Sequence, residues 1–117
     1  MIPPALAYHG PPMATLALTG RPGLKRPFEP YMSDHLHIPP STWHFDPTGQ
    51  EALDALDRVL EAAGPGTVSA SFCEPVSAAA LPSYSPPKRF WEGLASRRDR
   101  PGVMTWFGEP VPANGRT

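Results

Sequence analysis

The chain has 117 residues, of which 18 are proline, 40% are apolar and one is cysteine. This length allows one domain, and the formal net charge of −1 gives no basic surface of the kind that binds nucleic acid. A single cysteine cannot form an internal disulfide, which is compatible with a reducing compartment. No apolar run approaches membrane-spanning length, and the N-terminus lacks the basic region of a signal peptide. We therefore expect a cytoplasmic protein without a nucleic-acid or membrane partner.

Proline is concentrated near both ends and in the connections of the chain. We expect a single domain over residues 1–117, with poorly ordered flanks at 1–12 and 108–117. Residues 1–6 show no pattern that would pack against a core. Residues 13–19 (MATLALT) predict a short strand or a helical turn, which periodicity cannot separate in so short a run. The expected sheet includes a strand near Leu16.

Residues 21–47 form a long connection in which repeated prolines forbid any long regular element. This connection contains the pair His35 and His37. Such a pair can bind a metal when it lies on a strand, but the site then needs a third ligand. No cysteine or carboxylate is suitably spaced, so we expect no metal site.

The clearest helix is predicted over residues 48–63. Thr48 and Glu51 match a capping box, in which each side chain satisfies the other's free backbone N–H. Leu53, Leu56 and Leu60 fall on one face, and acidic residues fall on the other. The sequence Gly-Pro-Gly at 64–66 ends the helix.

A buried strand is predicted over residues 67–76 (TVSASFCEPV). Val68, Ala70 and Phe72 alternate onto one face, and the other face carries only small residues, as in a strand covered on both sides. Pro75 ends the strand because it has no N–H to donate. Glu74 then stands at the carboxyl end, where open α/β sheets build their ligand sites. A solvated acid at a strand end is the alternative.

A second helix is predicted to begin with Ser85 as N-cap and Pro86 at its first position. A further strand over residues 103–107 (VMTWF) is followed by a second acid, Glu109. In the helix that begins after Ser85, the apolar stripe consists of Phe90, Trp91, Leu94 and Ala95.

Helices and strands thus alternate along the chain, which indicates βαβ units with parallel strands. The predicted fold class is α/β, a partial three-layer α/β/α arrangement. Because the carboxyl ends of parallel strands share one edge of the sheet, Glu74 and Glu109 are expected to emerge at that edge.

Four short motifs follow one another along the chain: YHG at 8–10, ALTG at 17–20, EPV at 74–76 and GRT at 115–117. In this order they resemble motifs of the class III aminotransferases, which are pyridoxal-phosphate (PLP) enzymes of fold type I. Segments at 77–82, 85–87 and 90–94 look like those of the omega-type members. The resemblance covers about residues 8–117, matches only the middle of the longer family sequence, and implies part of the large domain.

The resemblance implies cofactor-binding positions at Tyr8, His9, Glu74 and Glu109. The aromatic ring of the YHG motif would stack on the flat PLP ring. The family's aspartate that pairs with the pyridinium nitrogen falls on Gly108. Its absence removes a charge-assisted contact of a kind that contributes roughly 1.5–3 kcal/mol. The Schiff-base lysine and the phosphate-binding segment of the family have no match here, so no catalytic residue is assigned, and whether the chain is an enzyme stays open.

The resemblance implies transfer of an amino group from an amino donor to an oxo acid, by a family that is typically homodimeric. These residues would form a fragment that is inactive alone, whether as a truncation, part of a split gene or a decayed copy. An alternative is a non-catalytic interaction module that pairs with a full-length relative. A proline-rich, partly disordered product without function also stays open.

Overall fold

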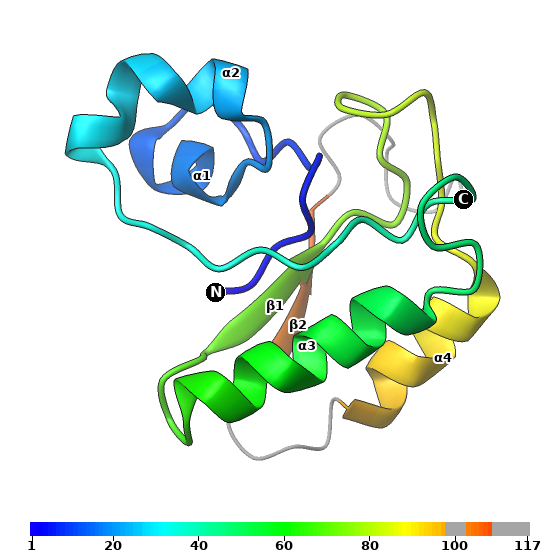
Figure 1. The fold of residues 1–117 in the computed structure, drawn as a ribbon. Helices are drawn as coiled ribbons and strands as arrows, with labels where there is room; N and C mark the ends of the chain where they lie inside the picture. Colours follow the sequence, from blue (N-terminus) through cyan, green and yellow to red (C-terminus); the bar gives the residue numbers. More distant parts are fainter. Residues whose placement is uncertain (98–102, 109–117) are drawn as a thin grey trace.

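The structure is a computed structural model that describes residues 1–97 and 103–108 (Figure 1). Within these ranges, no helix combines the length and apolar character needed to cross a membrane. The elements in chain order are α1 (Met13–Leu18), α2 (Pro22–Lys25), the 3-10 helix η1 (Arg26–Tyr31), α3 (Gln50–Ala63), β1 (Ala70–Cys73), α4 (Lys88–Arg97) and β2 (Met104–Phe107).

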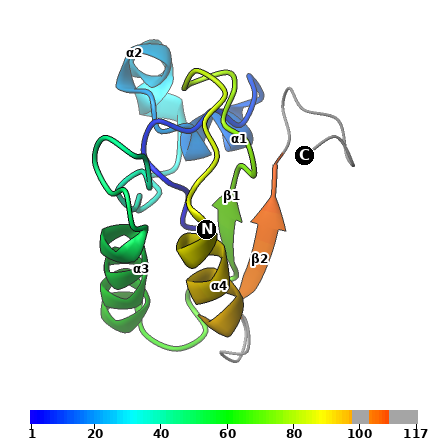
Figure 2. The same cartoon turned by 90° about the vertical axis from the view of Figure 1, so that its right-hand side faces the viewer.

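The described strands, β1 and β2, pair in parallel, with Ala70 opposite Met104 and Cys73 opposite Phe107. Helices α3 and α4 lie side by side over one face of this sheet, and α1 and α2 lie beyond the carboxyl ends of the strands (Figure 2). The predicted α/β class with parallel strands is confirmed. The strands β1 and β2 are adjacent in the sheet, and α4 lies between them in the chain. This is the βαβ order that the sequence pattern indicates.

The N-terminal segment extends the sheet on the other edge of β1. Ile2 N–H donates to the Ala70 carbonyl at 2.9 Å, and Phe72 N–H donates to the Ile2 carbonyl at 3.1 Å. The Ile2 side chain is 1% exposed. The expectation that residues 1–6 have nothing to pack is therefore wrong, because so short a run, interrupted by Pro3 and Pro4, gives no periodic signal.

The predicted strand near Leu16 is also wrong, since this residue lies in helix α1. Local hydrogen bonds close the helix, from Leu16 N–H to the Pro12 carbonyl at 2.7 Å and from Thr19 N–H to the Thr15 carbonyl at 3.2 Å. Pro12, with its φ of −56°, precedes the first turn, and alanine and leucine favour the helix that follows.

Helix α3 packs on the sheet through the face that the sequence predicts, with Leu53 and Leu56 buried and Leu60 partly buried. The N-terminal half of the chain contributes Ile2 and Ile38 to the same core. The buried core cluster consists of Ile2, Ile38, Ala52, Leu53, Ala55, Leu56, Cys73, Phe90 and Leu94.

The predicted capping box of α3 does not form. The helix begins at Gln50 after Gly49, whose φ is +75°. Asp46, which is buried, accepts the Ala52 N–H with Oδ2 at 2.9 Å. Thr48 instead accepts the Gln50 N–H at 3.3 Å. A carboxylate from the preceding loop thus satisfies a free N–H in the first turn of the helix, one residue beyond the N–H of Glu51 that the predicted capping box assigns to Thr48.

Helix α4 begins at Lys88, two residues after the predicted start at Pro86. Pro87 disfavours helical backbone at the residue before it, so Pro86 cannot open the helix. The Pro86 carbonyl accepts the Trp91 Nε1–H at 3.1 Å instead. Phe90 and Leu94 are buried as predicted, but Ala95 is exposed and lies outside the apolar stripe.

Strand β2 carries exposed apolar side chains on both faces of the sheet. Trp106 pairs in register with Phe72, and Met104 pairs with Ala70, so these side chains share the face opposite α3 and α4. Met104 is 56% exposed and Trp106 is 52% exposed. On the other face the Phe107 ring lies 5.8 Å from the Trp91 ring, and Phe107 is also 56% exposed. In β1, by contrast, Ala70 and Cys73 are buried, so the exposure belongs to β2.

Candidate functional site

Glu74 directly follows β1 and joins the end of that strand to the N-terminal segment. Its side chain is buried, with 5% exposed, and Oε1 accepts the backbone N–H of Tyr8 at 3.2 Å. The structure thus brings together two of the predicted cofactor residues, which are 66 positions apart. Glu109, the second predicted acid, lies outside the described residues.

The segment that carries Tyr8 is held on both sides of this contact. Leu6 N–H donates to the Gly20 carbonyl at 3.1 Å, and Gly20 N–H donates to the Ala7 carbonyl at 2.9 Å. His9 N–H donates to Thr19 Oγ1 at 3.1 Å. The Tyr8 side chain is nevertheless partly exposed. A fixed backbone with an accessible aromatic ring is the arrangement that stacking on a flat ligand requires.

The His9 ring packs against β1 rather than facing solvent. Its edge-to-face contact with Phe72 has a centroid distance of 4.5 Å and an interplanar angle of 88°. Both ring nitrogens are buried, with no hydrogen-bond partner among the described residues. Burial and, to a smaller degree, the charge of His37 lower the pKa of His9 from 6.5 to about 4. His9 is therefore a neutral packing group at neutral pH.

Burial also raises the pKa of Glu74, while the nearby Ser77 hydroxyl and the Tyr8 amide lower it in part. The second carboxyl oxygen, Oε2, is buried and has no hydrogen-bond partner among the described residues. Desolvation dominates over these neighbours, so the carboxyl holds its proton more tightly than a solvated glutamate does.

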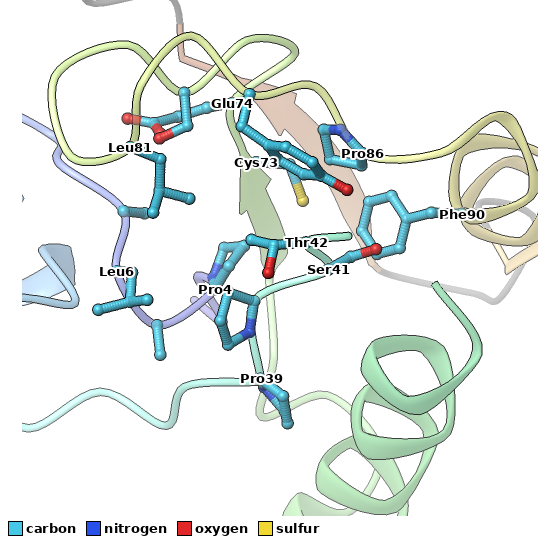
Figure 3. A pocket seen from close by; sticks show the side chains of 15 residues that line it. Pro4, Leu6, Pro39, Ser41, Thr42, Cys73, Glu74, Leu81, Pro86 and Phe90 are labelled. Carbon is cyan, nitrogen blue, oxygen red and sulfur yellow. The ribbon is translucent and has the colours of Figure 1, made fainter. Parts of the chain in front are cut away.

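A small cavity lies beside Glu74, which forms part of its wall (Figure 3). Its volume is about 40 Å³, and its walls include Leu81 and Phe90 as well as the hydroxyl-bearing Ser41 and Thr42. Neither Tyr8 nor His9 lines it. This volume accommodates molecules of the size of water, whereas ligand pockets for larger molecules are several hundred Å³. The cavity therefore does not provide the cofactor site.

Gly108 follows β2 and lies against Phe72. Its N–H donates to the Cys73 carbonyl at 2.9 Å. A Cβ atom at this position would stand 2.7 Å from Cε1 of Phe72 and 3.7 Å from Nδ1 of His9. The Phe72 ring thus occupies the space that any side chain at position 108 would need. The chain cannot accommodate an acid here unless that ring moves.

Lys25 and Lys88, the lysines of the chain, are both engaged elsewhere. Lys25 Nζ donates to the Ala17 carbonyl at 3.3 Å. Lys88 is exposed in the first turn of α4 and forms an ion pair with Glu92 at 3.2 Å. Neither is recorded in contact with Tyr8 or Glu74. The described residues thus offer an aromatic contact for a PLP ring but no amine for its covalent attachment, so they fit the cofactor's binding only in part.

His35 and His37 do not form a metal site with their surroundings. The ring nitrogens of His37 lie 2.8 Å from the His35 carbonyl oxygen and 3.1 Å from that of Leu18. Over residues 1–97 and 103–108, no group of three or more histidine, cysteine or acidic side chains is arranged to hold a metal ion.

The supports of the site, Thr19 and Phe72, were missed by the functional interpretation of the sequence. Thr19 belongs to the ALTG motif, which gave a faint signal of its importance, but nothing in the sequence pairs it with His9. Phe72 carried a signal only for burial in a strand.

No family model matches the sequence. A probable aminotransferase of Mycobacterium tuberculosis (strain ATCC 25618 / H37Rv) is 34% identical over 119 residues, which covers 96% of this chain and 25% of that protein. A hypotaurine/taurine–pyruvate aminotransferase of Paracoccus denitrificans (strain Pd 1222) is 29% identical over 115 residues, or 94% of this chain and 25% of that protein. The relatives are aminotransferases.

Solved structures give the same result. A transaminase from the marine bacterium Virgibacillus matches with a TM-score of 0.79 and 28% identity, over 91% of this chain and 23% of that one. A transaminase solved with L-Ala matches with a TM-score of 0.78 and 27% identity, over 89% and 26%. The chain thus spans about a quarter of the length of these proteins.

Proposed function

We propose that these 117 residues are a segment of the large domain of a class III, PLP-dependent aminotransferase of the omega type. Similarity to aminotransferases extends over 96% of the chain, and the fold is similar to that of transaminases at a TM-score of 0.79. The observation that carries the proposal is local. The carboxyl end of β1 and the partly exposed Tyr8 come together through the hydrogen bond from the Tyr8 N–H to Glu74, at the sheet edge where α/β folds bind ligands.

In this proposal the parent reaction moves an amino group from an amino donor to an oxo acid in the cytoplasm, in a homodimer. When bound, PLP supplies the electron sink for that chemistry. Tyr8 provides the flat surface for its ring, with His9 and Glu74 behind it and Glu109 as a further cofactor-binding residue.

The segment does not catalyse this reaction by itself. Covalent attachment and proton transfer need a lysine at the cofactor ring. Lys25 is bonded to the Ala17 carbonyl, and Lys88 is paired with Glu92 on the surface of α4. Gly108 carries no side chain that could pair with the pyridinium nitrogen.

The test is binding of pyridoxamine 5′-phosphate, which has the ring of PLP but no aldehyde to react with lysines. We expect weak, saturable binding by the chain in equilibrium dialysis. Tyr8→Ala should abolish it, and Tyr31→Ala should not, because Tyr31 is 81% exposed in η1 and lies outside the site. Absence of saturable binding, or equal binding by both variants, would contradict the proposal.

A second candidate function is a non-catalytic interaction module that pairs with a full-length relative. It is favoured by the apolar side chains of β2, since Met104, Trp106 and Phe107 are each more than half exposed. A group of exposed apolar side chains on one strand is a site for association. Co-purification with a full-length relative, lost in Trp106→Ser and kept in Tyr31→Ser, would support the module. Failure of the unmodified chain to co-purify would exclude it.

A further inference from the structure

Glu74 contacts Tyr8 through the Tyr8 backbone. Its Oε1 accepts the N–H of Tyr8, and its Oε2 is buried with no hydrogen-bond partner among the described residues. The resemblance had implied that Glu74 is a cofactor-binding residue in the pocket. The hydrogen bond to the Tyr8 backbone points to a positioning role instead.

We propose that Glu74 is a positioning residue, whose carboxyl oxygen fixes the Tyr8 backbone at the carboxyl end of β1 and so sets the place of the Tyr8 ring. The functional meaning of this ring placement rests on the proposed function. The contact itself does not, because it is a hydrogen bond within the chain.

The surrounding contacts explain why one hydrogen bond has this effect. Toward the N-terminus, Leu6 and Ala7 are bonded to Gly20, and on the other side His9 is bonded to Thr19. These hydrogen bonds join residues 6–9 to residues 19–20, which lie only about ten positions further along the chain. Within the described part of the chain, the hydrogen bond to Glu74 is the one that ties Tyr8 to the end of β1. The edge-to-face contact of His9 with Phe72 supports the same attachment without a hydrogen bond.

Two near-isosteric variants separate positioning from a role that needs negative charge. Glu74→Gln loses the charge but keeps an oxygen at the position of Oε1, so it can still accept the Tyr8 N–H. Glu74→Asp keeps the charge but withdraws the carboxylate by roughly 1.5 Å, one carbon–carbon bond, which takes it out of hydrogen-bond range. Positioning predicts that glutamine preserves function and aspartate does not. A direct ionic contact with a ligand predicts the reverse.

The experiment is hydrogen exchange of individual backbone amides in the full 117-residue chain. The Tyr8 amide should exchange about tenfold faster in Glu74→Asp than in the unmodified chain, as expected for loss of one such bond. In Glu74→Gln its rate should stay within about twofold. The Gly20 amide, bonded to Ala7, serves as the internal control, and Glu61→Ala, at an exposed glutamate of α3, serves as the matched control.

Faster exchange at Tyr8 in the aspartate variant alone supports the proposal. Equal rates in both variants, or faster exchange in the glutamine variant alone, would overturn it. Glu74→Ala should behave as the aspartate variant does, and if it does not fold the aspartate and glutamine variants still decide the question.

A second readout separates this inference from the proposed function. The affinity for pyridoxamine 5′-phosphate should be kept in Glu74→Gln and reduced in Glu74→Asp. If no chain binds this compound but the exchange rates follow the expected order, the proposed function fails and the positioning of Tyr8 stands. If aspartate retains binding and glutamine loses it, Glu74 acts by charge and the positioning role is wrong.

Discussion

Arg97 and Asp57 join α4 to α3 across 40 positions of sequence. Arg97 Nε donates to Oδ1 and Oδ2 of Asp57, each at 3.0 Å, and Nη2 donates to Oδ2 at 2.6 Å. Arg97 Nη1 also donates to the Gly93 carbonyl at 2.9 Å. Both side chains are largely shielded from solvent, so the pair is screened less than a surface ion pair. The pair therefore holds α3 and α4 against each other over the sheet.

Arg97→Ala should therefore lower the free energy of unfolding by about 1–2 kcal/mol, more than the loss of an exposed pair would. Arg97→Lys should recover only part of this, because an ammonium cannot reproduce the forked contact. The control is Lys88→Ala, which removes an exposed ion pair with Glu92 and should change stability by less than about 0.5 kcal/mol. Urea unfolding measures all three, and equal losses for Arg97→Ala and Lys88→Ala would contradict the account.

Gly49 sits where α3 meets α4. Its φ is +75°, and a Cβ atom there would stand 2.5 Å from the Cβ of Phe90. Gly49→Ala should lower the free energy of unfolding by at least about 2 kcal/mol, from both backbone strain and the clash. Gly23→Ala is the matched control, since no heavy atom lies within 4 Å of its Cβ position and alanine favours helix. A tolerated Gly49→Ala would show that the helices cross differently.

Phe72 and Gly108 should be energetically coupled, because the Phe72 ring fills the space beside Gly108. Gly108→Asp alone should destabilise the chain by about 1–3 kcal/mol, as overpacking does. Phe72→Val opens that space, so the double variant should be more stable than the sum of the single losses predicts, by at least about 0.5 kcal/mol. A double-mutant cycle in urea measures the coupling. Strict additivity would mean that the ring does not occupy the position.

His9 should make stability depend on pH. Its folded-state pKa of about 4 lies below the ordinary value of 6.5. Between these values the unfolded chain binds a proton that the folded chain does not, so stability falls as pH falls from 6.5 toward 4. Glu74, whose pKa is raised, acts in the opposite direction, since its contribution weakens as pH rises. His9→Phe should reduce the slope of the unfolding free energy against pH by an amount that corresponds to at most about one bound proton. The slope that the other titrating groups cause should remain.

Unfolding curves at several pH values between 4.5 and 6.5 measure this slope in both chains, over roughly the interval that the His9 shift defines. His35, whose pKa is also lowered by burial, is present in both chains and cancels in the comparison. Identical slopes for the two chains would mean that His9 titrates as an exposed histidine.

The parts of the fold that could be predicted from the sequence are those with a repeating pattern. The apolar face of α3, with Leu53 and Leu56, follows the helical period, and the strands β1 and β2 stand where β-favouring runs end at proline or glycine. Local patterns also predicted that Phe90 and Leu94 would be buried on α4.

The parts that could not be predicted depend on contacts between distant residues. Asp46 replaces the local cap of α3 because the loop brings its carboxylate under the helix, which no spacing rule describes. Ile2 is buried only because β1 offers it an edge. The bond between Glu74 and Tyr8 has the same origin, so the sequence pointed to both residues of the site but not to their relation.

The central claim is that these residues contribute a binding surface for the PLP ring without the lysine that would attach it. Borohydride reduction of the chain with PLP, followed by peptide mapping and an aminotransfer assay, tests it most directly. We predict no amino-group transfer. Labelling of Lys25 and Lys88 should be diffuse and well below one equivalent, because Lys25 is hydrogen-bonded to the Ala17 carbonyl and Lys88 is paired with Glu92. Stoichiometric labelling of one lysine, lost on its substitution together with measurable amino-group transfer, would contradict the claim.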